Sequence, residues 1–165
     1  MGDGFAAVRR ASRAVTQLYD LALAPVAMRA TQFTMLNVID QAGELAQCDF
    51  ARQYAFSVET LSRRFAALRK KGLVAIRLGP RCERIYSLTD KGRAALEGAR
   101  PYWQNAQARL RHSLGEADWL DFVIVCEKAV RAAREAEELR TCNRQSISNF
   151  ELPSQNRYDV KSSAA

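Results

Sequence analysis

Residues 57–88 read SVETLSRRFAALRKKGLVAIRLGPRCERIYSL, and this stretch decides the fold. Its first half predicts a helix capped by Ser57, because a serine hydroxyl can accept a hydrogen bond from a free backbone N–H of the first turn. Leu61, Phe65 and Leu68 recur at helical spacing and form an apolar stripe for the inner face. A glycine after two lysines ends the helix, since basic residues suit a helix C-terminus.

The second half of this stretch predicts a β-hairpin. Leu73–Arg77 and Arg84–Leu88 have the composition of short strands, and Gly79-Pro80 between them is a turn signal. Thr89 then caps a further helix. A helix followed by a basic hairpin is the order found in a winged helix-turn-helix, in which a preceding short helix braces the recognition helix by packing.

Helical patterns also precede this stretch. A long amphipathic helix is predicted from Phe5 to Ala22, and Pro25 ends or kinks it. A second helix begins with Thr31 as its cap and stops at Gly43. A short third helix follows, and its inner residues are Leu45, Phe50, Ala51 and Tyr54.

Two long helices follow the hairpin. The first starts at Thr89 and continues past Pro101, with a kink, to about Leu114, where a glycine breaks it. The second runs from about Glu116 to Leu139 and has an apolar face between Trp119 and Ala133. From Thr141 onward Ser, Asn, Gln and Pro dominate, which predicts disorder.

The positive charge of the chain is concentrated in one segment. The chain has a net charge of +7, and residues 57–93 hold ten basic and three acidic residues, so they account for the whole excess. A solvated face usually mixes both signs. A concentrated positive block indicates a polyanionic partner, most simply double-stranded DNA.

The candidate DNA-binding residues lie on the predicted recognition helix and on the hairpin. Inward placement of the apolar stripe leaves polar and basic side chains on the outside of the helix, where they can reach base edges or phosphates in the major groove. The hairpin can track phosphates or enter the minor groove. The candidates are Ser57, Thr60, Ser62, Arg63, Arg64, Arg81 and Arg84.

These segments carry a resemblance to a known family. Thr60–Val74 resembles the recognition helix and first wing strand of the MarR family of bacterial transcriptional regulators, and Ser87–Arg93, which reads SLTDKGR, resembles the segment that leaves the wing. Gln32, Phe33 and Leu36 stand where that family begins its second helix. The resemblance covers about residues 12–136.

The wing departs from the family pattern. The family commonly carries an Asp-Arg-Arg-like run before the second wing strand, and Pro80, Arg81 and Cys82 stand in those places. Arg81 matches one arginine, whereas Cys82 replaces the arginine that usually enters the minor groove. Arg84 is a candidate to substitute for it. The role of the wing is therefore better supported than that of any single wing residue.

The resemblance implies partners as well as a fold. It implies a homodimer built from the terminal helices, which binds a pseudo-palindromic operator with two recognition helices. It also implies a small aromatic effector that relieves repression. The residues that we consider for its pocket are Tyr19, Met28, Arg29 and Trp103, although each of them is also suited to a packed core.

The sequence as a whole therefore predicts a mostly α fold with a small β-hairpin wing: a winged helix-turn-helix with long terminal dimerisation helices. Residues 1–30 form an N-terminal dimerisation helix, and residues 31–88 form the DNA-binding lobe. Residues 89–140 form the C-terminal dimerisation helices, and residues 141–165 form a disordered tail. No apolar run is long enough to span a membrane and no secretory signal is evident, so we expect a cytoplasmic protein.

The sequence disfavours several other classes of function. The sequence has no glycine-rich phosphate loop, no Ser-His-Asp set and no paired acids on a shared face, which argues against an enzyme and against a cofactor. The single histidine, His112, and four cysteines without close spacing argue against a metal site. Two alternatives remain: a winged-helix protein-interaction module, and a thiol-based redox-sensing regulator that uses Cys82, which has arginines nearby.

Overall fold

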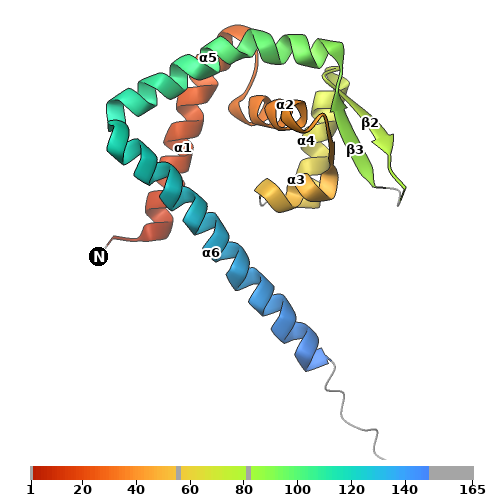
Figure 1. Cartoon of the computed structure of the whole chain (residues 1–165), viewed down its shortest axis with the longest axis vertical. Coiled ribbons are helices and arrows are strands. Elements are labelled where there is room, and N and C mark those ends of the chain that lie inside the picture. The colour runs from red at the N-terminus through yellow and green to blue at the C-terminus, as the bar shows by residue number, and fades with distance from the viewer. Residues whose placement is uncertain (1, 55–56, 81–82, 149–165) are drawn as a thin grey trace, which may run out of the picture. The chain divides into compact units, whose positions relative to one another are not determined.

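The computed structural model of the chain describes residues 2–54, 57–80 and 83–148, with side chains as far as residue 136. Two compact units are present, residues 1–119 and residues 120–165. Helices predominate in both, and a small sheet lies in the first (Figure 1). The elements are α1 (Gly4–Leu23), η1 (Ala24–Val26), α2 (Ala30–Ala42), β1 (Glu44–Ala46), α3 (Gln47–Tyr54), α4 (Val58–Lys70), β2 (Val74–Leu78), β3 (Arg84–Leu88), α5 (Asp90–Leu114) and α6 (Glu116–Ser148).

The sheet has three antiparallel strands in the order β1-β3-β2. The predicted hairpin is confirmed, with Val74 opposite Leu88 at its base. The third strand, β1, was not predicted: Leu45 was expected on a helix and lies instead opposite Tyr86 of β3. A strand of three residues has no periodicity to detect, and its partner lies beyond α3, α4 and β2, so this pairing has no local signal.

The core of the winged lobe forms around the apolar stripe of α4. Leu61, Phe65 and Leu68 are buried, as the spacing predicted. The Phe65 ring stacks on Tyr86 of β3 with ring centroids 3.7 Å apart and meets Phe50 of α3 edge-on at 5.5 Å. These aromatic contacts hold α4 against α3 and the sheet, and Figure 1 shows the three helices α2, α3 and α4 gathered beside the strands.

The chain leaves the wing through residues 89–92, where a threonine and a glycine each have a structural role. The Thr89 hydroxyl accepts a hydrogen bond from the backbone N–H of Gly92 at 3.0 Å and donates one to the Gly72 carbonyl at 2.7 Å. A Cβ at Gly92 would lie 2.0 Å from the carbonyl oxygen of Leu73, so this position tolerates only glycine. Thr89 is thus the cap of α5, as predicted, and it also ties α5 to the end of α4.

The start of α2 differs from its prediction. Thr31 was expected as the cap, but α2 begins at Ala30 and Thr31 lies inside it. The carboxylate of Asp20 on α1 accepts a hydrogen bond from the Ala30 backbone N–H at 2.7 Å. A side chain of another helix therefore caps α2, in place of the expected Thr31. The sequence around Ala30 does not reveal this cap, because Asp20 lies ten residues earlier.

The last helix is longer than predicted. Gly115, at φ +83°, separates α5 from α6 as expected. We predicted an end near Leu139, but the helical backbone continues to Ser148, so residues 141–148 do not belong to a disordered tail. Polar residues here include good helix formers such as Arg144 and Gln145, and no proline occurs between Glu116 and Leu152. The rest of the predicted tail, residues 149–165, lies outside the described residues.

Candidate nucleic-acid interface

The N-terminal end of α4 presents two hydroxyls. Ser57 caps the helix, and its Oγ accepts a hydrogen bond from the Thr60 backbone N–H at 3.3 Å. The same oxygen lies 2.9 Å from Thr60 Oγ1, to which it donates. Both predicted residues therefore lie together at the positive end of the helix dipole, where an anionic backbone is favoured.

Two arginines follow on α4, in different surroundings. Arg63 is exposed and has no hydrogen bond or ion pair within the described residues. Arg64 is half-buried and interacts with other groups of the chain. Arg63 is thus the predicted side chain that is best placed to reach a ligand outside the chain.

Ser62 and Arg84 are brought together by the fold. Arg84 of β3 donates from Nη1 to Ser62 Oγ at 3.4 Å, which links the wing to α4. Ser62 Oγ also accepts from Nε2 of Gln47 at 2.7 Å. Sequence reasoning missed Gln47: a glutamine in a polar stretch carries no periodic signal, and its burial arises only when α3, α4 and β3 pack together.

The wing is closed by a hydrogen bond from the Gly79 backbone N–H to the Glu83 carbonyl at 2.8 Å. Arg81 and Cys82, the predicted residues of its tip, lie outside the described residues. Arg77 on β2 donates from Nε to Glu44 on β1 at 3.0 Å, across β3. This hydrogen bond holds the pKa of Glu44 below its usual range. Arg77 is therefore one of the basic residues whose charge is matched inside the protein.

The other basic residues of this segment differ in whether an acidic side chain pairs with them. Arg93 pairs with Asp40, with Nη1 and Oδ1 3.7 Å apart, so the positive excess around α4 is smaller than the sequence count. Lys71 donates to the side-chain oxygen of Gln32 at 3.3 Å and keeps its charge. The exposed basic residues on α4, the wing and the start of α5 with no ion pair among the described residues are Arg63, Arg69, Lys70, Lys71, Arg84 and Lys91.

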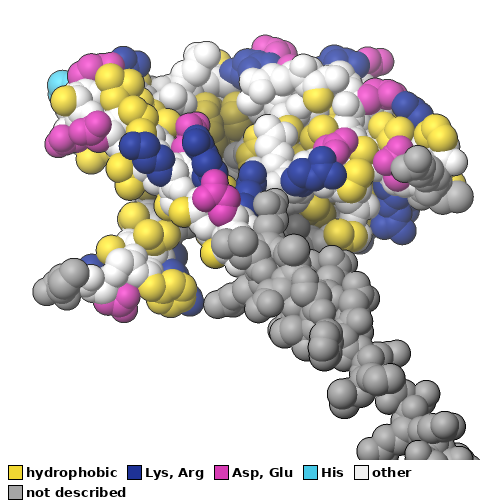
Figure 2. Space-filling model, turned by 60° about the horizontal axis from the view of Figure 1, so that its bottom comes forward, with side chains coloured by type: hydrophobic (Ala, Val, Ile, Leu, Met, Phe, Trp, Pro, Cys, Tyr) yellow, Lys and Arg dark blue, Asp and Glu magenta, His cyan; other side chains and the backbone are white. Residues whose placement is uncertain are grey.

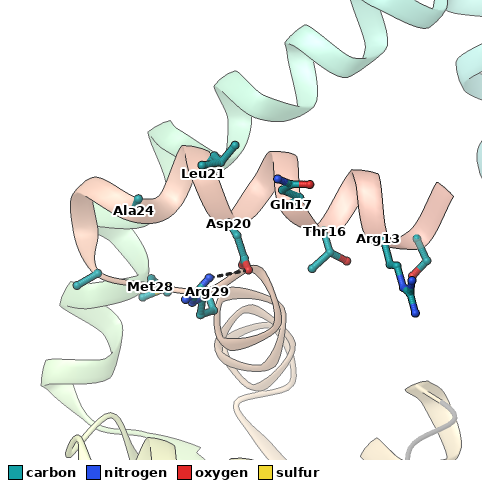
Figure 3. A pocket seen from close by; sticks show the side chains of 10 residues that line it. Arg13, Thr16, Gln17, Asp20, Leu21, Ala24, Met28 and Arg29 are labelled. Carbon is teal, nitrogen blue, oxygen red and sulfur yellow. Dashed lines mark hydrogen bonds and ion pairs between the residues drawn. The ribbon is translucent and has the colours of Figure 1, made fainter. Parts of the chain in front are cut away.

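The four residues considered for an effector pocket fall into two groups. Tyr19 and Trp103 pack against each other with ring centroids 4.2 Å apart, and Phe33 stacks on Trp103 with ring centroids 4.3 Å apart. Met28 and Arg29 instead line an open pocket of about 720 Å³ beside α1 (Figure 3). Tyr19 and Trp103 therefore have the packed surroundings that the sequence also allowed. Met28 is only 6% exposed and also belongs to the core, although it borders the pocket.

The pocket is polar where α1 meets the start of α2. Figure 3 shows Asp20 pointing from α1 to Arg29, and Arg29 Nη1 lies 3.1 Å from Asp20 Oδ2. Arg13, Thr16 and Gln17 continue the lining along α1. The pocket therefore combines two arginines and one carboxylate with the exposed apolar surface of Leu21.

The fold is shared with solved structures of transcriptional regulators. The order of helices and the three-stranded wing define a winged helix-turn-helix protein. Solved structures with this fold include the M. tuberculosis transcriptional regulator MosR in complex with DNA, at 35% identity and a TM-score of 0.71 over 84% of this chain and 99% of that one. The transcriptional repressor CouR bound to a 23-mer DNA duplex matches at 25% identity and a TM-score of 0.68, over 75% of this chain and 89% of that one.

A more distant structure agrees in fold. A mutant MarR from E. coli in complex with operator DNA matches at 20% identity and a TM-score of 0.69, over 78% of this chain and 99% of that one. No sequence-family model and no curated protein matches the chain. The chain belongs to the MarR family of transcriptional regulators.

Two further observations bear on the alternatives. None of the helices that the structure describes combines the length and the apolar composition needed to cross a membrane. Cys48 and Cys126 are free and exposed, whereas Cys82, on which a redox-sensing function would depend, lies outside the described residues. The similar proteins favour DNA-binding regulation over redox sensing as the main function.

Proposed function

We propose that this protein is a sequence-specific DNA-binding transcriptional regulator that binds a pseudo-palindromic operator as a homodimer. The observation that carries the proposal is the exposed basic side of α4 beside the wing, with Arg63 unpaired among the described residues. The resemblance to MosR and CouR, both solved with DNA, supports it. In this proposal α4 lies in the major groove with its N-terminal hydroxyls and Arg63 toward the DNA.

The wing supplies the second contact. Arg84 lies beside Ser62, so one surface can present both α4 and the hairpin to DNA. We expect Arg84, and Arg81 at the tip, to neutralise phosphates or to enter a narrow minor groove. Neutralising phosphates releases counterions, so binding should weaken steeply as the salt concentration rises.

Homodimer formation is supported by apolar surface that the described residues leave uncovered. Phe5 and Val8 near the start of α1 are 69% and 64% exposed, and Figure 2 shows yellow hydrophobic side chains on this end of the helix. An apolar helix face in water is stabilised by burial against a second copy. A two-fold dimer would carry two α4 helices, which suits an operator with two half-sites.

A small effector would bind in the pocket lined by Met28 and Arg29. An aromatic compound with an anionic group fits this lining, because the exposed Leu21 supplies apolar surface and Arg13 supplies positive charge beside the Arg29–Asp20 ion pair. We propose that the regulator acts as a repressor and that the effector relieves repression. Calorimetric titration of the protein with benzoate-like compounds, followed by titration of the protein–DNA complex, measures both steps.

The experiment that tests the proposal is a DNA-binding titration of Arg63→Ala. On an operator selected from genomic DNA fragments, the variant should lose about 1–3 kcal/mol of binding free energy while remaining folded. Arg109→Ala is the matched control, because it removes the same charge from an exposed site on α5. Equal operator affinity for the wild type and Arg63→Ala would exclude this role of α4 and leave a winged-helix protein-interaction module as the alternative.

A further inference from the structure

One buried amide connects the three elements of the winged lobe. Gln47 on α3 is 7% exposed and is the one buried residue among the described residues that is neither aliphatic nor aromatic. Its Nε2 donates to the Val58 carbonyl at 3.1 Å and to Ser62 Oγ at 2.7 Å. Its Oε1 accepts from the Tyr86 hydroxyl at 3.1 Å. Every hydrogen-bonding group of this amide is therefore used.

The orientation of the amide is determined by its partners. The Val58 carbonyl can only accept, so the nitrogen of the amide must face it. Burial raises the pKa of Tyr86, so the phenol keeps its proton at neutral pH and can donate to Oε1. The two hydrogens of Nε2 then point to Val58 and to Ser62. A flipped amide would place an oxygen against the Val58 carbonyl and is excluded.

This orientation of the amide makes the Ser62 hydroxyl oxygen accept a hydrogen bond from Gln47. Its second partner, the Arg84 guanidinium at 3.4 Å, has donors only. A serine hydroxyl has two acceptor sites and one hydrogen. Both acceptor sites face donors, and among the described residues the hydroxyl hydrogen has no acceptor. The hydrogen is therefore what Ser62 can offer to a molecule outside the chain.

We infer that Ser62 meets DNA only as a hydrogen-bond donor, with a polarity that Gln47 sets. This inference rests on the proposed function and adds the chemistry that Ser62 recognises. Acceptors in the major groove are O6 and N7 of guanine, N7 of adenine and O4 of thymine, whereas the edge of cytosine presents an amino donor. A phosphate oxygen is an acceptor of the same kind. Against a base edge, this polarity makes Ser62 a specificity-determining residue that disfavours cytosine on the strand it contacts. In either case Gln47 is its positioning residue.

Selection from a library of random-sequence DNA duplexes with the full-length protein tests the donor role. Ser62→Ala removes the hydrogen, and Ser62→Thr retains a hydroxyl. We expect Ser62→Ala to reduce discrimination against cytosine at one position of each half-site by about two- to ten-fold, the worth of one hydrogen bond. Ser62→Thr should keep the wild-type preference. If the acceptor is a phosphate, Ser62→Ala should instead weaken all sequences by the same factor, and Ser62→Thr should restore binding.

Gln47→Met tests the positioning role, because methionine has a similar shape and no donor. Released from Gln47, Ser62 can rotate and accept as well as donate, so the variant should tolerate cytosine at the same position. A purely structural role would lower the melting temperature and weaken all sequences equally. If Gln47→Met does not fold, the two Ser62 variants still decide the donor inference.

Three outcomes would overturn the inference, and they can be told apart. A wild-type protein that enriches no sequence overturns the proposed function together with this inference. A wild-type protein that enriches an operator, with Ser62→Ala unchanged in both affinity and preference, overturns the inference alone. A preference for cytosine that depends on Ser62 would show an acceptor in place of a donor and would also overturn it.

Discussion

Two amphipathic helices of the first unit differ in what covers their apolar side chains. On α4, Leu61 and Phe65 are fully buried against α3 and the sheet. Near the start of α1, Phe5 and Val8 stand largely in solvent although they recur at similar spacing. Helical periodicity therefore identifies an apolar face, but it does not say whether the same chain or a second copy covers it.

The largest expected effect lies in the covered region. Phe65→Ala removes a ring that stacks on Tyr86 and contacts Phe50, and it leaves a cavity in the winged lobe. We expect a loss of about 3–5 kcal/mol in the free energy of unfolding. Denaturant unfolding followed by circular dichroism, at a fixed protein concentration, measures it.

Phe5→Ala is the matched change in the uncovered region. Because the ring is exposed within one chain, it should alter the unfolding free energy of the separated chain by less than about 0.5 kcal/mol. It should instead weaken self-association, measured by analytical ultracentrifugation over a dilution series. If Phe5→Ala self-associates as tightly as the wild type, this end of α1 does not contribute to self-association.

Two glycines of α5 sharpen the comparison at the backbone. Gly92→Ala would drive a methyl group into the Leu73 carbonyl and should cost about 3 kcal/mol of stability. Gly98 on the same helix has open space around it, so Gly98→Ala should raise stability by roughly 0.5–1 kcal/mol. Thermal unfolding of both variants measures the difference. Equal melting temperatures would show that α5 does not approach the Leu73 carbonyl as closely as described.

The junction of α1 with the winged lobe should show a smaller effect. Asp20→Ala removes the acceptor for the Ala30 backbone N–H and should cost about 1 kcal/mol. Asp20→Asn keeps an acceptor and should restore part of the loss. Asp3→Ala removes the cap of α1 at its exposed end and serves as the control, with a smaller change in melting temperature. An equal loss for Asp3→Ala and Asp20→Ala would contradict the tie between α1 and α2.

The smallest effect on stability is expected for an ion pair on the surface of the sheet. Arg77→Ala should let the pKa of Glu44 rise toward its ordinary value, because the hydrogen bond that lowers it is lost. A lowered carboxyl pKa favours the folded state above the ordinary pKa, and this contribution disappears as the pH falls through the lowered value. Both groups are solvent-exposed, so the melting temperature at neutral pH should scarcely move. NMR titration of Glu44 follows the pKa, and a large fall in melting temperature would contradict this assignment.

Much of the winged lobe could be predicted because its signals are local. Ser57 and Thr89 cap the helices that follow them, and Gly43 and Gly115 end the helices before them. The apolar spacing of α4 predicted its buried face. Most of the candidate DNA-binding residues could be assigned to this helix and the hairpin for the same reason, although their contacts with DNA stay a prediction.

The parts that sequence reasoning missed depend on residues far apart in the chain. Strand β1 exists because β3 pairs with it, and the cap of α2 comes from Asp20 on α1. The burial of Gln47 depends on Tyr86, 39 residues away. No local sequence pattern around a polar residue such as Gln47 indicates a hydrogen-bond partner that lies so far along the chain.

The sequence by itself determined where most helices begin and end, which face of α4 is apolar and where positive charge gathers, because caps, periodicity and charge act over a few neighbouring residues. Only the tertiary structure decided which basic residues lack an acidic partner and whether the Ser62 hydroxyl donates or accepts a hydrogen bond. Arg77 is matched by Glu44 across the sheet, and Ser62 is held by Gln47 and Arg84 from two other elements. Ion pairs and hydrogen bonds act over a few ångströms, so they require the fold to bring distant residues together.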